Sequence, residues 1–185
     1  MLNGFDGKEP VVGFETYVSD TAIVIGDVKI GDNCYIGHGA ILRGDYGSIQ
    51  IGNGTAVEEG AIVHAPPDDV CSIGDRVTIG HGAIVHSKWI GNHTLIGMGA
   101  ILSLHAEVGE RSIIAEGCVV KFGQKIPGGV LAVGNPAKVT RQVSESEKHK
   151  QEKRLEESSG SSIDSERLYI DLAKKYLRIG MPRID

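Results

Sequence analysis

Three histidines stand at positions from which their imidazole rings could share a metal ion. His64 closes the segment GAIVH, and His81 and His86 lie five residues apart in IGHGAIVH. A neutral imidazole nitrogen is a common ligand of zinc and of other divalent transition metals. Whether the three rings can meet depends on where each one points, and that depends on the elements that carry them.

Those elements follow a six-residue repeat. Aliphatic residues recur at six-residue steps, are commonly followed by glycine and have a small residue four places on, as in IGDNCY, IGHGAI, IGNGTA and IGNHTL. A helical period of 3.6 residues cannot produce this spacing. The repeat instead predicts a solenoid of short strands joined by tight corners, with three hexads in each triangular coil of about 18 residues. The inward aliphatic positions are then Val18, Val24, Ile30, Ile36, Leu42, Ile51, Val57, Val63, Ile73, Ile79, Val85, Ile90, Ile96, Leu102, Val108, Ile114 and Val120.

The hexad frame predicts that two of the histidines share one corner. His64 and His86 each directly follow an inward valine, and they are separated by one coil plus a four-residue insertion in HAPPDDVCS. They should therefore stack on adjacent coils about 4.8 Å apart, with Arg43 on the coil below. Two rings at that spacing can converge on one metal ion, or they can form an ordinary stacked pair of surface histidines.

His81 belongs to a different corner. Five extended residues span about 16 Å, so His81 and His86 of one chain are too far apart to share a metal. If His81 is a ligand, it must serve a neighbouring chain. A three-fold ring permits this, with His64 and His86 from one chain and His81 from the next. His38 lies in the same column as His81, but Arg43 stands on its next corner, so we expect a structural or interfacial role for His38.

The composition limits the class of protein. The 185 residues fit one solenoid domain over residues 1–143, including an N-terminal lead-in, followed by a helical segment over residues 144–185. The net charge of −5 gives no support for binding to nucleic acid or to an anionic membrane. No apolar run approaches about 18 residues, and residues 1–8 lack a signal-peptide core. We therefore expect a cytoplasmic protein.

The three cysteines are isolated in the sequence and odd in number, which argues against a disulfide framework. Cys34 and Cys118 occupy small-residue positions of the repeat, whereas Cys71 follows the insertion. We therefore expect Cys34 and Cys118 to belong to the core.

The last part of the chain lacks the hexads and is rich in charged residues. SESE at positions 144–147 matches a capping box, which predicts a helix through KHKQEKRLEE that the segment SSGSS ends. The apolar spacing over residues 165–178 predicts a second, amphipathic helix. We expect this helix to pack on the solenoid or on a neighbouring subunit.

Several segments resemble one family. ILRGDYGSI, GAIVHAPPDD, IGHGAIVH and IGMGAIL together are similar to the γ-class carbonic anhydrases and their relatives from carnitine and phenylacetate operons. The resemblance implies an all-β solenoid, a left-handed parallel β-helix of hexapeptide repeats with C-terminal α-helices, assembled as a homotrimer. It implies reversible hydration of CO2 to bicarbonate. It also implies that His64, His81 and His86 bind Zn²⁺, or Fe²⁺ or Co²⁺, across the subunit interface.

The resemblance assigns roles to other residues as well. Arg43 and Asp45 correspond to an Arg and an Asp that pair across the interface and help to order the site. Asp68 and Asp69, in the loop after His64, are candidates for relaying the proton that hydration releases.

The chain departs from the family pattern before the first ligand. Glu58 occupies the position of a glutamine that orients the bound water or bicarbonate, Ala56 occupies that of an asparagine, and the acidic residue before glycine is kept as Glu59. A carboxylate at position 58 could accept a proton from the water. It would also repel bicarbonate and perturb the pKa of the water.

Two other functions remain open. AVGNPAKVTR is shared with hexapeptide acyltransferases, so the chain could be an acyl-CoA acyltransferase, or a thioesterase acting through the same metal-bound water. Against the acyltransferase, the sequence has no long loop with a separate catalytic histidine. The third possibility is a catalytically silent trimer that keeps the metal for stability, which Glu58 favours.

Overall fold

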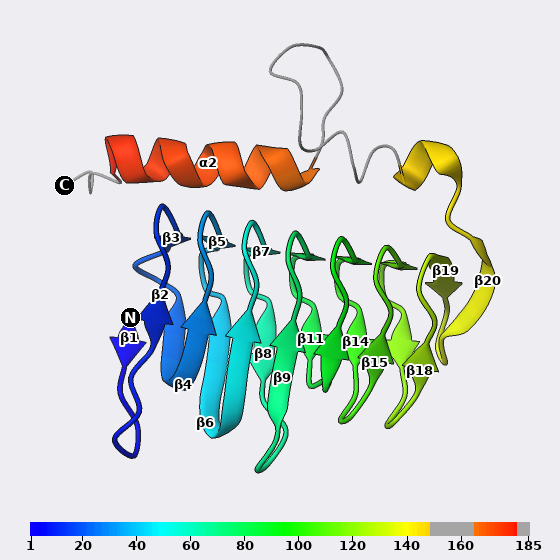
Figure 1. The fold of residues 1–185 in the computed structure, drawn as a ribbon, viewed down its shortest axis with the longest axis horizontal. Coiled ribbons are helices and arrows are strands. Elements are labelled where there is room, and N and C mark those ends of the chain that lie inside the picture. Colours follow the sequence, from blue (N-terminus) through cyan, green and yellow to red (C-terminus); the bar gives the residue numbers. More distant parts are fainter. Residues whose placement is uncertain (149–164, 181–185) are drawn as a thin grey trace.

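The computed structural model of the chain describes residues 1–148 and 165–180 as a parallel β-solenoid with one long helix beside it (Figure 1). The strands form two sheets, a 12-stranded sheet that bends around a corner and an 8-stranded sheet. The bend lies in β6 (Ile41–Ile51), whose first residues pair with β8 (Ile62–His64) and whose last residues pair with β9 (Val70–Ile73). The solenoid therefore has three faces, which confirms the architecture that the hexads predict.

From Ile84 to Ile96 the chain runs through the first, the second and the third face in turn. The first face holds β1 (Leu2–Asn3), the first halves of β4 (Ile23–Ile30) and β6, then β8, β11 (Ile84–Val85), β14 (Ile101–Leu102) and β17 (Val119–Val120). The second face holds β2 (Val11–Val12), the second halves of β4 and β6, then β9, β12 (Trp89–Ile90), β15 (Glu107–Val108) and β18 (Lys125–Ile126). The third face holds β3 (Tyr17–Val18), β5 (Tyr35–Ile36), β7 (Ala56–Val57), β10 (Thr78–Ile79), β13 (Leu95–Ile96), β16 (Ile113–Ile114), β19 (Val130–Val133) and the antiparallel β20 (Lys138–Gln142).

The strand register confirms the hexad frame. Leu42 pairs with Val63, Val63 with Val85, and Val85 with Leu102, and all four side chains are fully buried. Burial of apolar surface is the main favourable contribution to folding, and this core contains almost only aliphatic side chains. Cys34, Cys71 and Cys118 are free and buried, so the expectation that Cys34 and Cys118 belong to the core is confirmed.

The corners use glycine in two ways. At Gly97, which follows an inward isoleucine, a Cβ atom would lie 2.6 Å from the amide nitrogen of Glu116 on the next coil. Only glycine leaves room for the backbones to approach so closely. Two residues later, Gly99 has a φ of +65°, a conformation that residues with a side chain rarely adopt. Each corner therefore stacks closely on the next one and also turns sharply.

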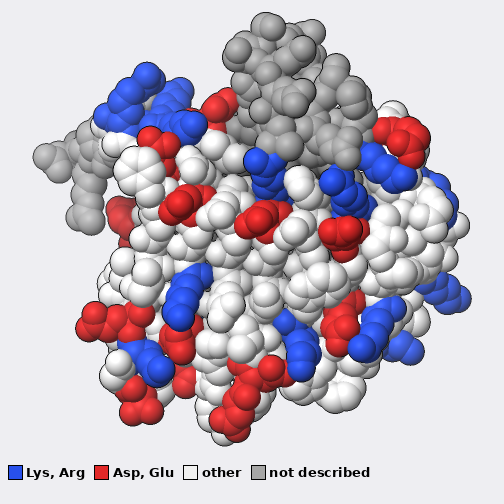
Figure 2. Space-filling view, in the orientation of Figure 1, with Lys and Arg blue, Asp and Glu red and all other residues white. Residues whose placement is uncertain are grey.

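The outward positions of the first face are apolar. Six of these residues pair in register from coil to coil, and we name them the isoleucine ladder: Ile23, Ile41, Ile62, Ile84, Ile101 and Val119. The outward positions of the second face are mostly polar, and Glu107 and Lys125 form an ion pair there at 3.1 Å. On the side of the molecule seen in Figure 2, Lys and Arg side chains are interspersed with Asp and Glu. The first face thus differs from an ordinary solvated sheet surface.

The C-terminal segment begins with the expected capping box. The Ser144 hydroxyl accepts a hydrogen bond from the Glu147 amide at 3.3 Å, and the Glu147 carboxylate accepts one from the Ser144 amide at 2.7 Å. Residues 145–148 are helical, whereas the rest of KHKQEKRLEE and the SSGSS break lie outside the described residues. No helix in the two described ranges is long and apolar enough to cross a bilayer.

The second expected helix is confirmed as α2 (Ser165–Ile179). It runs back along the solenoid toward the N-terminal coils and lies beside β3, β5 and β7 (Figure 1). Tyr17, Tyr35 and Ala56 of the third face form a buried cluster with Ala173 of the helix. This cluster anchors α2 on the solenoid itself.

Candidate functional site

The candidate site residues fall into two groups at opposite edges of the first face. The first half-site consists of Arg43, Asp45, His64 and His86, where the first face meets the second. The second half-site consists of Glu58, Glu59, His81 and Tyr169, where the third face meets the first. Among residues 1–148 and 165–180, no three His, Cys, Asp or Glu side chains of the chain are arranged to hold a metal ion. One chain therefore brings together two of the three predicted ligands.

The rings of His64 and His86 stack as the hexad frame predicts. Their centroids are 4.6 Å apart with an angle of 20° between the planes, and His64 Nδ1 lies 2.7 Å from His86 Nε2. Burial, together with the charges of His64, Arg43 and His105, lowers the pKa of His86 below its ordinary value. His86 is therefore neutral at neutral pH, which is the form that binds a metal.

Asp45 holds the other side of the His64 ring. Its Oδ1 atom lies 3.4 Å from His64 Nε2, and both atoms are buried without a further hydrogen-bond partner in the described part of the chain. Its Oδ2 atom accepts hydrogen bonds from Arg43 Nε at 3.2 Å and Nη2 at 3.0 Å. Burial opposes ionisation of Asp45, but Arg43, together with a backbone hydrogen bond and the nearby His64, lowers the pKa of the carboxyl.

Arg43 and Asp45 pair within one chain, and the pair across a subunit interface that the resemblance implies stays a prediction. The intrachain pair has a local reason: residues two apart on the extended β6 project to the same side of the strand, so the guanidinium lies beside the carboxylate.

The second half-site fixes the ring of His81. His81 Nδ1 lies 2.8 Å from Glu59 Oε2, while Nε2 lies 3.3 Å from Glu58 Oε2 and 3.1 Å from the Tyr169 hydroxyl. The shorter of the two carboxylate contacts, at Nδ1, favours the proton on that nitrogen, so Nε2 is the better placed of the two nitrogens to act as a ligand. Tyr35 in turn donates a hydrogen bond to Glu59 at 2.5 Å.

Glu58 lies with His81 and not with the His64–His86 pair. The amides of Gly37, Glu58 and Gly80 each donate a hydrogen bond to the carbonyl oxygen of the inward residue on the next coil. Glu58 therefore occupies a corner position that is glycine on the adjacent coils. The residue is 5% exposed, and its carboxylate accepts a hydrogen bond from the His81 amide at 3.0 Å. Burial raises the pKa of Glu58, although the nearby His81 ring and amide act in the opposite direction.

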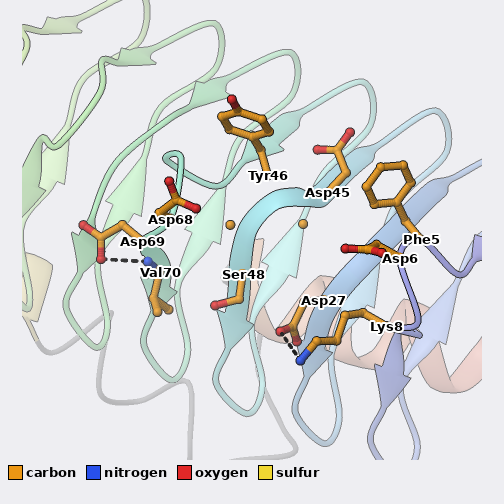
Figure 3. A pocket seen from close by; sticks show the side chains of 12 residues that line it. Phe5, Asp6, Lys8, Asp27, Asp45, Tyr46, Ser48, Asp68, Asp69 and Val70 are labelled. Atoms are coloured by element: carbon orange, nitrogen blue, oxygen red, sulfur yellow. Dashed lines mark hydrogen bonds and ion pairs between the residues drawn. The ribbon is translucent and has the colours of Figure 1, made fainter.

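A hollow of about 360 Å³ lies beside the first half-site, where β6 turns the corner (Figure 3). Asp45, Tyr46, Asp68 and Asp69 are among its lining residues. Asp68 is exposed, whereas Asp69 accepts the Val70 amide at 2.8 Å and pairs with Lys88 at 3.2 Å. These two interactions lower the pKa of Asp69, which makes it a weak proton acceptor at neutral pH.

Two residues of the site have roles that the sequence does not predict. The family pattern marks Glu59 only as a retained acidic residue, although the hexad frame places it two positions after inward Val57, in the column of His38 and His81. Tyr169 belongs to α2, and no sequence pattern indicates which coil that helix contacts. His38 bonds Ser19 at 2.6 Å and packs edge-on against Tyr176, so its environment is structural.

Comparison with known proteins finds a matching family model and several related proteins. Residues 9–44 match the bacterial transferase hexapeptide family (six repeats). The chain is 39% identical over 145 residues to the carnitine operon protein CaiE of Salmonella agona, covering 78% of this chain and 73% of the relative. It is 34% identical over 153 residues to γ carbonic anhydrase 2, mitochondrial, of Arabidopsis thaliana, covering 80% of this chain. The match spans 55%, about half, of the length of that relative.

The fold also has close counterparts among solved structures. A hexapeptide transferase family protein from Anaplasma phagocytophilum superposes with a TM-score of 0.84 at 34% identity, covering 95% of this chain and 98% of that one. The shared hexads, coil register and length of the matches lead to one conclusion. The chain belongs to the hexapeptide-repeat family, as a left-handed parallel β-helix protein whose relatives include γ carbonic anhydrases and CaiE proteins.

Proposed function

We propose that the chain forms a homotrimer that binds one metal ion at each of its three interfaces and catalyses the reversible hydration of CO2 to bicarbonate. One observation carries the proposal. His64 and His86 point nitrogens at each other across 2.7 Å at one edge of the first face, while His81 stands at the opposite edge with Glu59 on its Nδ1.

The position of the half-sites supports a ring. A surface with complementary groups at its two edges joins copies head to tail, and such an interface closes into a ring when the rotation allows it. Three triangular solenoids side by side satisfy this condition. The first half-site of each chain then meets the second half-site of the next, so every interface contains three histidines.

The isoleucine ladder also indicates that the first face is the interface between chains. Ile84 and Ile101 are 43% and 37% exposed in the single chain, and they are adjacent in register. A contiguous apolar strip at the surface is typical of a protein–protein interface. The isoleucine ladder lies between the two half-sites. Burying the ladder against neighbouring chains would therefore bring each half-site next to a half-site of another chain.

The histidines fit a metal ion by their surroundings. His64 and His81 each present one nitrogen to a carboxylate, of Asp45 and Glu59, an arrangement typical of metal-binding histidines. The other nitrogen of His64 faces His86, and that of His81 faces the Tyr169 hydroxyl and Glu58. The 2.7 Å between the facing nitrogens of His64 and His86 must open to roughly 3.3 Å for tetrahedral coordination. Three imidazoles suit Zn²⁺ and also Fe²⁺ or Co²⁺.

Such an ion supplies hydroxide at neutral pH, because it lowers the pKa of its water to about 7. The protein residues support this chemistry. Arg43 and Asp45 keep the ring of His64 in place. Glu58 lies close enough to His81 to form a hydrogen bond with an oxygen atom of a ligand held beside that ring. Hydration releases one proton for each bicarbonate. Exposed Asp68, beside the hollow of Figure 3, is better suited than Asp69 to pass that proton to solvent.

One experiment tests the function as a whole. The protein is purified without oxygen, so that an iron form is kept, and its metal content and rate of CO2 hydration are measured. We expect about one metal per chain and hydration that disappears on chelation and returns with added metal. Far less than one equivalent of metal, with no hydration by the metal-loaded protein, would rule the proposal out.

The substitution Glu58→Gln should shift the pH profile of hydration to lower pH. A carboxylate near a bound cation disfavours loss of a proton from its water, and replacing it with an amide removes that charge. The rate near neutral pH should therefore rise. The measurement is the rate of CO2 hydration from about pH 6 to 9. An unchanged rate and profile would mean that Glu58 does not influence the reaction.

An acyl-CoA acyltransferase or thioesterase is the second candidate. The solved relative named as a transferase, at 34% identity over 95% of this chain, favours it. Chelation distinguishes the two forms of this candidate. Acyl-CoA turnover that survives chelation indicates a metal-independent acyltransferase, and turnover that is lost indicates hydrolysis through the metal-bound water.

The third candidate is a catalytically silent trimer, held together in part by its metal. In that case, removal of the metal would loosen the trimer while none of these substrates is turned over. For all three candidates we propose a cytoplasmic location, in keeping with the absence of a membrane-spanning helix from the described residues.

A further inference from the structure

Tyr169 occupies the nitrogen that His81 would offer to a metal. The Tyr169 hydroxyl lies 3.1 Å from His81 Nε2, and the two rings meet edge-on with centroids 6.3 Å apart. Nδ1 is held by Glu59, so Nε2 is the remaining ligating position of the ring. One nitrogen cannot bond both a tyrosine hydroxyl and a metal ion at the same time.

The contact joins the second half-site to α2. The Tyr169 ring packs on Tyr35 with centroids 4.9 Å apart, and Tyr176, further along the helix, stacks on Tyr17 at 4.7 Å. The Glu58 carboxylate is a second neighbour of the Tyr169 hydroxyl. Burial and the charges of Glu58 and Glu59 raise the pKa of Tyr169 to about 12, so the phenol keeps its proton. The helix therefore touches His81 through one polar atom, while aromatic packing anchors it elsewhere.

We propose that Tyr169 and the metal compete for His81, so that metal capture at the interface releases Tyr169 and loosens the adjacent part of α2. This inference rests on the proposed function, because the metal must take Nε2 of His81. The competition is reciprocal by thermodynamic linkage: whatever stabilises the Tyr169–His81 contact weakens metal binding, and bound metal destabilises that contact. Tyr169 is thus a positioning residue that keeps His81 ordered until a neighbouring chain and a metal arrive.

The test is the substitution Tyr169→Phe, which removes the hydroxyl and keeps the ring packed on Tyr35. A typical hydrogen bond contributes about 0.5–1.5 kcal/mol, so the variant should bind metal roughly 2- to 12-fold more tightly. Affinity is measured on the metal-free trimer by titration with Co²⁺, using its visible absorption. The matched control is Tyr176→Phe, since Tyr176 also packs its ring beneath the helix but lies on Tyr17 and His38, away from His81. The control should leave the Co²⁺ affinity unchanged.

Hydrogen exchange provides a second measurement that does not depend on activity. Amides of α2 near Tyr169 should exchange faster in the Co²⁺-loaded wild type than in the metal-free protein, and this difference should shrink in Tyr169→Phe. Unchanged or weaker Co²⁺ binding by Tyr169→Phe would overturn the competition and leave the metal site standing. A wild-type trimer that binds no Co²⁺ would overturn both proposals, so the two failures are distinguishable.

Discussion

Replacing His86 with alanine should abolish stoichiometric metal binding and leave the solenoid folded. The substitution leaves two imidazoles at each interface, one from each chain. Loss of a residue that merely orients a ligand already weakens metal binding by roughly 10- to 100-fold, so loss of a ligand should cost more than about 100-fold. Metal per chain, measured by elemental analysis after dialysis, should fall close to zero together with CO2 hydration.

His105→Ala is the matched control for this variant. His105 lies near the same corner and contributes to the lowered pKa of His86, but its contacts are Asp69 at 3.9 Å and the edge of Phe122. Its replacement should leave the metal content unchanged. Full metal content in His86→Ala, or equal losses in both variants, would exclude His86 as a specific ligand.

Ile84→Glu should dissociate the trimer and thereby remove the metal from a chain whose three histidines are intact. Ile84 lies in the isoleucine ladder between the two half-sites. An unpaired carboxylate buried in an apolar interface costs several kcal/mol, and a ring contains three copies of it. Mass measured by light scattering should fall from three chains to one, with loss of bound metal.

Trp89→Glu separates this effect from a general effect of surface charge. Trp89 is 42% exposed, nearly the same as Ile84, and lies on the adjoining strand of the same coil, but it faces outward on the mostly polar second face. The variant should remain trimeric and keep its metal. A trimeric Ile84→Glu with full metal content would mean that the first face is not the interface.

Much of the fold follows from the sequence because the solenoid is built from local rules. An inward aliphatic residue every six positions, a glycine where adjacent corners nearly touch and a small residue four positions on determine each coil independently of distant segments. The same frame gives the register, since one coil stacks on the next. For this reason the hexads alone predict the pairing of Arg43 with His64 and the stacking of His64 with His86.

The rest of the site depends on contacts that no period describes. The position of α2 is determined by tyrosines of β3 and β5 that pack against tyrosines of the helix, and the sequence alone does not pair them. The bond from Tyr169 to His81 therefore cannot be predicted from the repeat. The family pattern marks Glu58 as the position of a residue that orients the bound water, but it does not show that Glu58 and His81 stand on the same corner of one chain.

The most direct test of the shared site is complementation between two defective chains. His81→Ala and His86→Ala chains are co-expressed with different tags, and trimers that contain both are isolated and analysed for metal. Neither chain alone should bind metal. Each mixed ring has one interface at which an intact His64–His86 pair meets an intact His81, so about one metal ion per mixed trimer is predicted. Mixed trimers without metal would contradict a site built from two chains.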